Sequence, residues 1–591
     1  MMGERTIVRT RRLAGSMTIA FVVSVLIPVH VHGQNESIPV ETRQAALAGD
    51  AEAQFELGVI YYDGTDVEQD YEEAFNWYSK AAEQDHAKAQ YMLGFMYARG
   101  RGVEENVARA LQWYRNAAEQ GHVRAQYRIG AMYLNGDGVD ESPSEAFVWL
   151  QKAAVQEDSD AQVRLGYMYK YGIGVEADPG KGLAWFIKSA EQGHYSAQYF
   201  VGLIYDTGDG VPVDDEKAVY WYRKAAEQDH DASQINLGIM YSQGEGVTKD
   251  ATQAAYWYRR AAEQGNAQAQ FYLAARYTRG DGVPKDIGKA VEWYLKAAEQ
   301  GVAEAQYNLA ARYARGDGLP VDNTRAALWY RKAAEQDHVQ AQFNLAVLYD
   351  DEDSNIGNVD EAVHWYRKAA DQGDSSAQYI LGYKYDHGDG VPEANAEAVR
   401  WYILAANQGI DDAQERLGYM YHLGDGVEQD WIEAYRWYRM AAEAGHTGAR
   451  YNLGVMYAFG EGRPTNHPEA LRWFRLAADQ GHEMAQYNLG LSYDKGRGVP
   501  KDDSEAVKWY LMAAEQGKIE AMTNMGIVHF NGDRSMRDLV KAYAWIGLAA
   551  ERGDSIAVHN LELVKQNMTE SMLDQAEELL GSIRERIDPA Q

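Results

Sequence analysis

The chain contains 591 residues and no cysteine, and its formal net charge is −31. Such a charge argues against a nucleic-acid partner, because phosphate binding needs a net basic surface. The lack of cysteine excludes disulfides, zinc–thiolate sites and thiol catalysis. Packing and hydrogen bonding alone must therefore hold the fold together.

Residues 1–33 have the features of a secretory signal peptide. An arginine-rich stretch is followed by an apolar run over residues 17–31 and by Gly33, after which we expect cleavage. The run is shorter than the roughly 20 residues that cross a bilayer, and it contains Pro28 and His30. We therefore expect an exported, periplasmic protein with no stable membrane span after cleavage. Secretion, or anchoring by an uncleaved signal, are the alternatives.

Tryptophan recurs every 36 residues over most of the chain. A fixed period of this length indicates that one supersecondary unit is stacked on copies of itself. The pattern predicts a single elongated domain of fourteen repeats over residues 51–553. A capping helix is expected over residues 34–50, and further capping helices over residues 554–591. The recurring residues are Trp77, Trp113, Trp149, Trp185, Trp221, Trp257, Trp293, Trp329, Trp365, Trp401, Trp437, Trp473, Trp509 and Trp545.

Each repeat is predicted to be a pair of helices joined by a glycine turn. In the unit over residues 86–121, apolar and small residues fall at helical spacing in both halves. The first helix is expected to end at Gly100 and Gly102, because a sharp exit from a helix uses the left-handed region. The second begins after a cap such as Asn106, and thirteen of the fourteen caps are Asp, Asn or Ser, with Ala394 the exception. The fold class is therefore all-α.

Glycines inside the first helix predict a close helix–helix approach. Gly94 is one of them, and a glycine in a helix interior costs about 1 kcal/mol relative to alanine. An aromatic ring packed where the side chain would stand explains this cost. We assign the Trp-Tyr pair of the second helix, Trp113 and Tyr114 in this unit, to the core between repeats rather than to ligand stacking.

The repeat closely resembles that of the Sel-one-like repeat family, a relative of the tetratricopeptide repeats. The resemblance covers residues 51–553. It implies a right-handed α/α superhelical solenoid and a role as an adaptor or scaffold for protein complexes. In the unit discussed above, the matching residues are Ala89, Leu93, Gly94, Tyr97, Gly100, Gly102, Val103, Ala110, Trp113, Tyr114, Ala117, Ala118 and Gly121.

One stripe of the first helices is a candidate binding surface. Positions i, i+4 and i+7 outside the family pattern should share a face, which we expect to line the inner surface of the superhelix. Guanidinium groups on this stripe would hold carboxylates of a partner. The alternative is local pairing with acids such as Asp281 and Asp317. Four arginines occupy the stripe in the seventh and eighth repeats: Arg276, Arg279, Arg312 and Arg315.

A row of asparagines lies on the same stripe. An amide both donates and accepts hydrogen bonds, so the row suits capture of an extended peptide backbone. The favoured alternative is a structural bond between repeats, because most polar groups satisfy local structure. The row consists of Asn236, Asn308, Asn344, Asn452, Asn488 and Asn524.

Metal binding and catalysis find little support in the sequence. Asp351, Asp353 and Asn355 have the opening spacing of a calcium loop, but Gly357 comes one place late and Ala362 stands at the glutamate position. Seven of the fifteen histidines share one repeat position, and no repeat gathers a nucleophile, a base and an orienting acid. We therefore expect no metal, no cofactor and no enzymatic activity.

The sequence as a whole predicts an adaptor that binds a protein or peptide partner along the inner surface of the solenoid. One alternative is a scaffold for an envelope glycan, in which Tyr171, Phe200 and Phe459 stack on sugars. Another is a cell-wall amide hydrolase, an activity of cysteine-rich relatives whose cysteines this chain lacks.

Overall fold

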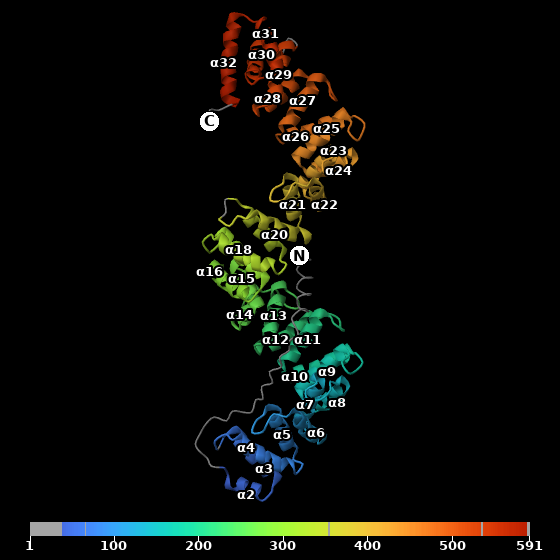
Figure 1. The fold of residues 1–591 in the computed structure, drawn as a ribbon, viewed down its shortest axis with the longest axis vertical. Coiled ribbons are helices and arrows are strands. Elements are labelled where there is room, and N and C mark those ends of the chain that lie inside the picture. The colour runs from blue at the N-terminus through green and yellow to red at the C-terminus, as the bar shows by residue number, and fades with distance from the viewer. Residues whose placement is uncertain (1–37, 66, 353–354, 533–535, 588–591) are drawn as a thin grey trace. The chain divides into compact units, whose positions relative to one another are not determined.

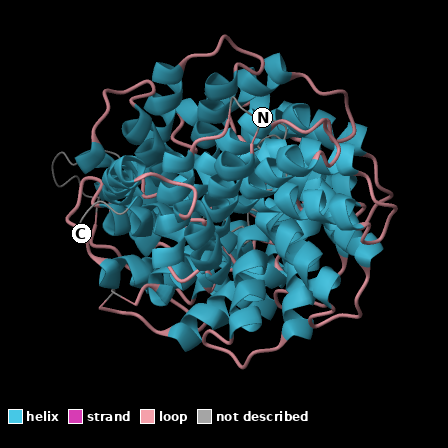
Figure 2. Cartoon of the chain, turned by 90° about the horizontal axis from the view of Figure 1, so that it is seen from above, coloured by secondary structure: helices cyan, strands magenta, loops and turns pink. Residues whose placement is uncertain are grey.

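The computed structural model describes residues 38–65, 67–352, 355–532 and 536–587, and the predicted signal peptide lies outside them. These described residues form helices joined by short turns, with no strand among them, as Figure 2 shows. The prediction of an all-α chain of repeated helix pairs is confirmed. The handedness of the superhelix stays a prediction.

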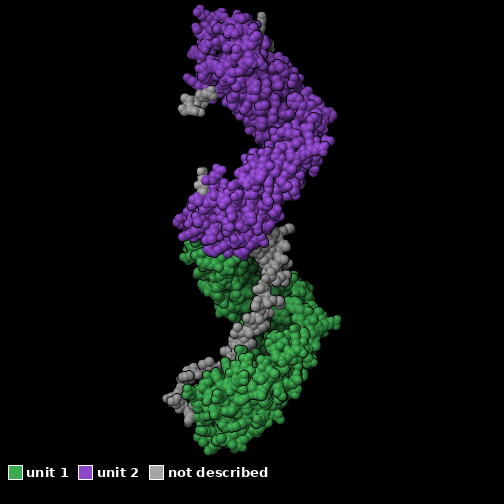
Figure 3. All heavy atoms as spheres, viewed as in Figure 1, with its two compact units in different colours: residues 1–305 green, residues 306–591 purple. Residues whose placement is uncertain are grey.

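The chain divides into two compact units, residues 1–305 and residues 306–591, coloured separately in Figure 3. Figure 1 labels the helices. Those of the first unit are α2 (Val40–Leu47), α3 (Ala51–Asp63), α4 (Tyr71–Ala82), α5 (Ala87–Arg99), α6 (Val107–Glu119), α7 (Val123–Asn135), α8 (Pro143–Val155), α9 (Ser159–Tyr171), α10 (Pro179–Glu191), α11 (Tyr195–Thr207), α12 (Asp215–Glu227), α13 (Asp231–Gln243), α14 (Ala251–Glu263), α15 (Ala267–Arg279) and α16 (Ile287–Glu299).

The unit boundary falls within α17 (Ala303–Arg315). The helices that follow it are α18 (Asn323–Ala334), α19 (Val339–Asp350), α20 (Val359–Asp371), α21 (Ser375–His387), α22 (Asn395–Asn407), α23 (Asp411–Leu423), α24 (Trp431–Ala444), α25 (Thr447–Phe459), α26 (His467–Ala478), α27 (Glu483–Lys495), α28 (Asp503–Glu515), α29 (Ile519–Asn531), α30 (Leu539–Glu551), α31 (Ser555–Lys565) and α32 (Glu570–Ile587).

Each repeat pairs an odd-numbered helix, here called the A helix (α3 to α29), with the next even-numbered helix, the B helix (α4 to α30). The predicted turn and cap chemistry is present. Gly100 ends α5 in the left-handed region at φ 61°, and the Asn106 side chain accepts from the Arg109 backbone N–H at the start of α6. Ala394 makes no side-chain cap hydrogen bond, as its sequence requires.

The predicted close approach of the two helices occurs at the interior glycines. A Cβ added to Gly94 would lie 2.6 Å from Cδ1 of Tyr114, so the ring occupies the space of the absent side chain. Within the Trp-Tyr pair it is therefore the tyrosine that requires the glycine. The tryptophan packs toward the preceding repeat, as Trp257 does against the cluster that contains Tyr222 and Leu237.

A ladder of glutamines links successive repeats, and the sequence analysis missed it. Gln90 on α5 donates to the Ala82 carbonyl at 3.2 Å and accepts from Gln120 of α6 at 2.8 Å. Eleven such pairs join glutamines 30 residues apart, at 2.7 to 2.9 Å. Buried amide groups need hydrogen-bond partners, and the ladder provides them for the glutamine side chains of both helices. Its signal was visible as Gln at two fixed positions of nearly every repeat.

Histidines cap many of the A helices. Nδ1 of His122 accepts from the Ala125 backbone N–H, and the ring stacks on Tyr91 of the preceding repeat at 4.7 Å. His86, His194, His230, His338, His446 and His482 cap in the same way. Accepting at Nδ1 requires that this nitrogen carry no proton. The sequence analysis ascribed these histidines to the repeat unit, and their structural role agrees with that.

Helices outside the repeats cover both ends of the array. α2 places Ala46 against Ala53 and Leu57 of α3. At the other end, Leu580 and Ile583 of α32 join the last repeat's buried cluster. Uncovered ends of a repeat array would expose the apolar face that each inner repeat buries against its neighbour.

Candidate functional site

The candidate stripe of the A helices is uneven in its exposure. At its first position, which includes the asparagine row, side chains are mostly half-buried. At its second position, methionine recurs and is buried, as at Met96, Met168 and Met240. The third position, at the end of the A helices, is exposed in every repeat except two, where Asp63 and Thr207 are half-buried. The interpretation of the stripe as one exposed surface therefore needs correction, because its middle position faces the neighbouring helices.

The four predicted arginines differ in exposure according to their position on the stripe. Arg276, at the buried position, pairs with Asp281 and donates to Ser242 of the preceding A helix. This pairing with Asp281 is the local alternative that the sequence analysis stated. Arg312 is also buried, with 8% of its surface exposed. Arg279 and Arg315, which end α15 and α17, are exposed.

The asparagines make contacts between neighbouring A helices. Asn524 donates to the Tyr487 hydroxyl at 3.2 Å, and Asn452 donates to the Glu415 carboxylate at 2.9 Å. Asn344 lies 3.5 Å from the Tyr307 hydroxyl and 3.4 Å from that of Tyr330. Burial raises the pKa of Tyr451, and its hydrogen bond with Asn488 opposes this rise. Asn236 is buried and Asn308 half-buried. Such contacts correspond to the structural alternative, and a role of this row in partner binding stays a prediction.

Ion pairs around two buried side chains, Lys384 and Asp386, join α19, α21 and α23. Lys384 replaces the usual methionine and is 2% exposed, with Nζ 2.6 Å from Asp350 and 2.8 Å from Asp389. Burial opposes its charge, but the two carboxylates outweigh burial and raise the pKa of Lys384.

Arg416 of α23 extends this network with two bonds to buried Asp386 of α21, at 2.6 and 2.8 Å. The Tyr402 hydroxyl also donates to this carboxylate, at 3.1 Å. Burial alone would raise the pKa of Asp386, but Arg416 outweighs it and the pKa is lowered. Charged side chains thus fix neighbouring A helices where apolar ones do so elsewhere.

Exposed apolar side chains cover the same A helices. We call this surface the apolar A-helix face and define it as Val347, Tyr383, Tyr419, Leu423 and Phe459, on α19, α21, α23 and α25. Their exposed fractions run from 38% to 74%, the largest at Phe459. His387 stacks on Tyr383 at 4.0 Å, and the Arg416 guanidinium lies 4.9 Å from the Tyr419 ring centre. Exposed apolar side chains gathered on neighbouring helices are typical of interaction sites.

Polar bonds between neighbouring A helices hold this face together. Lys384–Asp350 joins α19 to α21, Arg416–Asp386 joins α21 to α23, and Asn452–Glu415 joins α23 to α25. The sequence analysis singled out Phe459 but missed the other members. A signal was available for Tyr383 and Tyr419, which lie four places before the ends of α21 and α23, a position that is apolar or alanine in every repeat.

No group of three or more potential metal ligands is found among the described residues. Of the calcium-like turn, Asp353 lies outside them. Within the part of the chain that the structure describes, no helix combines the length and apolar character needed to cross a bilayer.

The fold and the site define a class of protein: a tandem α/α solenoid with a constant framework and variable exposed A-helix positions. The chain belongs to the Sel1 repeat family, whose members generally mediate protein–protein interaction. The matched segments are residues 51–86, 87–122, 123–158, 159–194, 196–230, 231–266, 267–302, 303–338, 339–374, 375–410, 411–446, 447–482, 483–518 and 519–554.

Two solved structures illustrate the resemblance. The chain is 32% identical to c5321, a protective antigen of uropathogenic Escherichia coli with an SLR fold, over 87% of this chain and 95% of that chain, with a TM-score of 0.36. It is 34% identical to a Sel1 repeat protein from Oxalobacter formigenes, over 41% of this chain and 96% of that chain, with a TM-score of 0.37. No curated protein matches the chain.

Proposed function

We propose that this chain is an exported, non-catalytic adaptor that binds a protein or peptide partner along the apolar A-helix face. The observation that carries the proposal is the run of five exposed apolar side chains on four consecutive A helices. Exposing Phe459 and the apolar side chains of three neighbouring A helices to water is unfavourable unless a partner buries them.

Exposed arginines that end other A helices suit contacts with acidic groups of a partner. Arg279 and Arg315 occupy the repeat position of Leu423 and Phe459, and both are exposed. In this proposal they hold carboxylates of the partner, while the asparagine row gives the A helices a fixed spacing. The signal-like pattern of residues 1–33 supports a periplasmic location, with secretion as the alternative.

The experiment is a selection of peptides from a random display library on the purified chain that starts at residue 34. Selected peptides are measured against wild type and the Tyr419→Ser, Phe459→Ser double variant. The matched control is Leu328→Ser with Leu404→Ser, which removes exposed leucines from B helices α18 and α22. We expect binding to weaken by roughly tenfold or more only in the A-helix variant, as for loss of buried interface side chains. Equal binding by all three proteins would refute the proposal.

An envelope polysaccharide is a second candidate ligand, favoured by exposed aromatic rings on A helices. Tyr171 of α9 is half exposed and stacks on Tyr167 at 6.0 Å, and Phe459 is the most exposed ring. Aromatic faces pack well on the apolar faces of sugars. Soluble peptidoglycan fragments, titrated against wild type and Tyr171→Ser, separate this function from peptide binding, because only glycan binding should depend on Tyr171.

A further inference from the structure

A cavity of about 380 Å³ lies between α5, α6 and α7 and beneath the turn that follows α7. Its size falls within the range of about 300–1,000 Å³ that is typical of small-ligand sites. Apolar walls come from Phe95 and Ala98 of α5, Val107 of α6 and Met132 of α7. One part of the cavity is therefore apolar.

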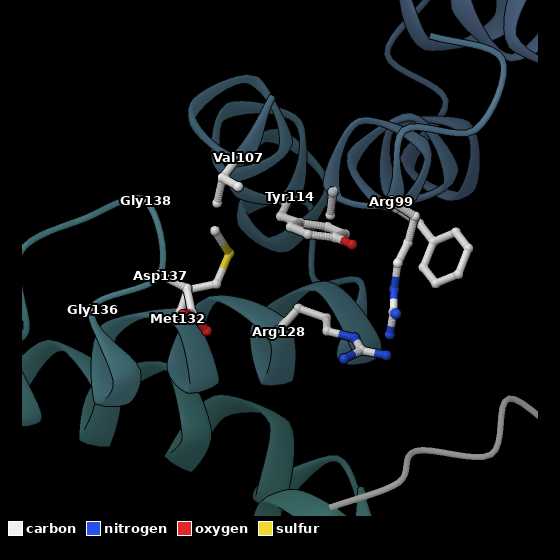
Figure 4. Close-up of a pocket in the computed structure, with 10 residues that line it drawn as sticks. Arg99, Val107, Tyr114, Arg128, Met132, Gly136, Asp137 and Gly138 are labelled. Carbon is white, nitrogen blue, oxygen red and sulfur yellow. The ribbon is translucent and has the colours of Figure 1, made fainter. Parts of the chain in front are cut away.

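Two guanidinium groups stand at one side of this cavity. Arg99 is the last residue of α5, and Arg128 lies on α7. Figure 4 shows both side chains directed to the same side of the pocket, close to the Tyr114 hydroxyl. Among the described residues, neither arginine has an ion pair or a side-chain hydrogen bond with a carboxylate.

Several cations on other A helices pair with a carboxylate instead. The net charge is −31, and Arg276, Lys384 and Arg416 each pair with aspartate. Two like charges on adjacent helices repel each other unless an anion lies between them. The arrangement is therefore complementary to a ligand that carries a negative charge.

Tyr114 adds a neutral donor to the same side. Its ring is buried against Gly94, and burial raises the pKa of its hydroxyl, an effect that Arg128 and Arg99 oppose. The hydroxyl thus keeps its proton at neutral pH and is able to donate. Among the described residues that line the cavity, Asp137 is the one acid; it accepts from Asn135 at 3.2 Å and lies on the opposite side in Figure 4.

We propose that this pocket binds the C-terminal residue of a peptide, with its carboxylate between Arg99 and Arg128 and its apolar side chain against Val107 and Met132. Arginine forks match the two oxygens of a carboxylate. Only a terminal residue carries a carboxylate and an apolar side chain on the same carbon. An aspartate or glutamate side chain, or inorganic phosphate, would occupy only the space between the two arginines and would leave the apolar part of the pocket empty.

This site lies on α5 to α7, whereas the proposed adaptor face lies on α19 to α25. A variant of one region leaves the other intact, so the two proposals fail separately.

The experiment measures weak binding of short peptides by saturation-transfer NMR and calorimetry. The probes are acetyl-Ala-Ala-Leu with a free carboxylate, the same peptide as its amide, acetyl-Asp-Ala-Leu amide, and inorganic phosphate. The proteins are wild type, Arg99→Gln with Arg128→Gln, and the control Arg400→Gln, which removes an exposed arginine from the B helix α22.

We expect the free acid to bind wild type and the control roughly tenfold or more tightly than its amide, as for hydrogen bonds to a charged group. The double variant should lose this preference. Equal binding of acid and amide by wild type, equal binding of the aspartate peptide, or displacement of the acid by equimolar phosphate would each overturn the proposal.

A second measurement needs no variant. Phenylglyoxal modifies accessible arginines, and mass spectrometry locates the modified residues. The free-acid peptide should protect Arg99 and Arg128 while its amide does not, and Arg400 should react equally in both. Equal modification of Arg99 and Arg128 with acid and amide would contradict the proposal.

Discussion

The junction of α5 with α7 and the junction of α19 with α21 share one backbone plan and differ in chemistry. In the first, Ala98 and Met132 face the cavity. In the second, the same repeat positions carry Asp350 and Lys384, whose charged groups lie 2.6 Å apart. The tyrosine that packs between the helices, Tyr114 or Tyr366, is the same in both.

This difference shows which residues the fold requires and which it leaves free. Caps, turn glycines, packed tyrosines and the glutamine ladder recur in most repeats, because each repeat buries a similar surface on its neighbour. The position of Met132 accepts an apolar or a charged side chain, provided that a charged one meets its partners. Differences in binding between the two junctions must therefore come from such positions.

Overpacking the shared framework should have the largest effect. Gly94→Leu places a side chain where the Tyr114 ring lies, since even a Cβ would be 2.6 Å from the ring. We expect a loss of about 3 kcal/mol in unfolding free energy. Gly94→Ala is the control and should cost less, because Ala346 takes this position opposite Tyr366. Chemical denaturation of both variants measures the difference, and a Gly94→Leu chain as stable as wild type would contradict the packing argument.

Removing Lys384 should break the charged junction alone. Lys384→Ala leaves Asp350 and Asp389 without their cation and should cost about 2 kcal/mol. The cost is smaller than for fully buried pairs, because both aspartates retain contact with solvent. Lys384→Met with Asp350→Ala recreates the Ala98–Met132 pair and should recover most of the loss. A double variant no more stable than Lys384→Ala would show that the two junctions are not interchangeable.

The two junctions also differ in how the second A helix is capped. His122 caps α7, whereas Asp374 caps α21. Burial, aided by the charge of Lys88, lowers the pKa of His122 below its ordinary 6.5. The unfolded chain therefore binds more protons than the folded one as pH falls through 6.5, so stability decreases there.

His122→Asn should remove this pH dependence, because Asn266 caps α15 with the same geometry. We expect the wild type to lose about 1 kcal/mol between pH 7 and pH 5 from this cap. Thermal unfolding against pH measures it, with His364→Asn on α20 as a control that caps no helix. A variant whose pH profile matches that of wild type would rule out the histidine cap as the cause.

The smallest effect concerns the glutamine ladder that both junctions share. The ladder is interrupted at Gln414, whose buried Oε1 has no partner, because Ala444 stands where a glutamine donates elsewhere. Ala444→Gln should restore the bond and stabilise the chain by about 1 kcal/mol. Ala444→Leu, which adds bulk without a donor, should not. An unchanged melting temperature for Ala444→Gln would mean that the ladder contributes no net stability.

The framework could be predicted from the sequence because its causes are local and repeated. The tryptophan period, the cap at Asn106 and the glycine at Gly94 each specify one geometry. The ladder was missed because a glutamine's partner lies 30 residues away, and spacing alone does not show that the two side chains meet.

The candidate site was harder to predict, because burial at the stripe depends on the neighbouring repeat. Helical periodicity grouped Arg276 with Arg279 on one face, yet the first packs against Ser242 of the preceding A helix and the second is exposed. The pocket beside Arg99 and Arg128 requires three helices and the following turn, and no single-helix pattern indicates it.

The central claim, that the A helices carry the partner surface, is tested most directly by hydrogen–deuterium exchange with and without a peptide selected on the chain. We expect slower exchange at the C-terminal ends of α19, α21, α23 and α25, and unchanged exchange along the B helices. Protection confined to the B helices would contradict the account.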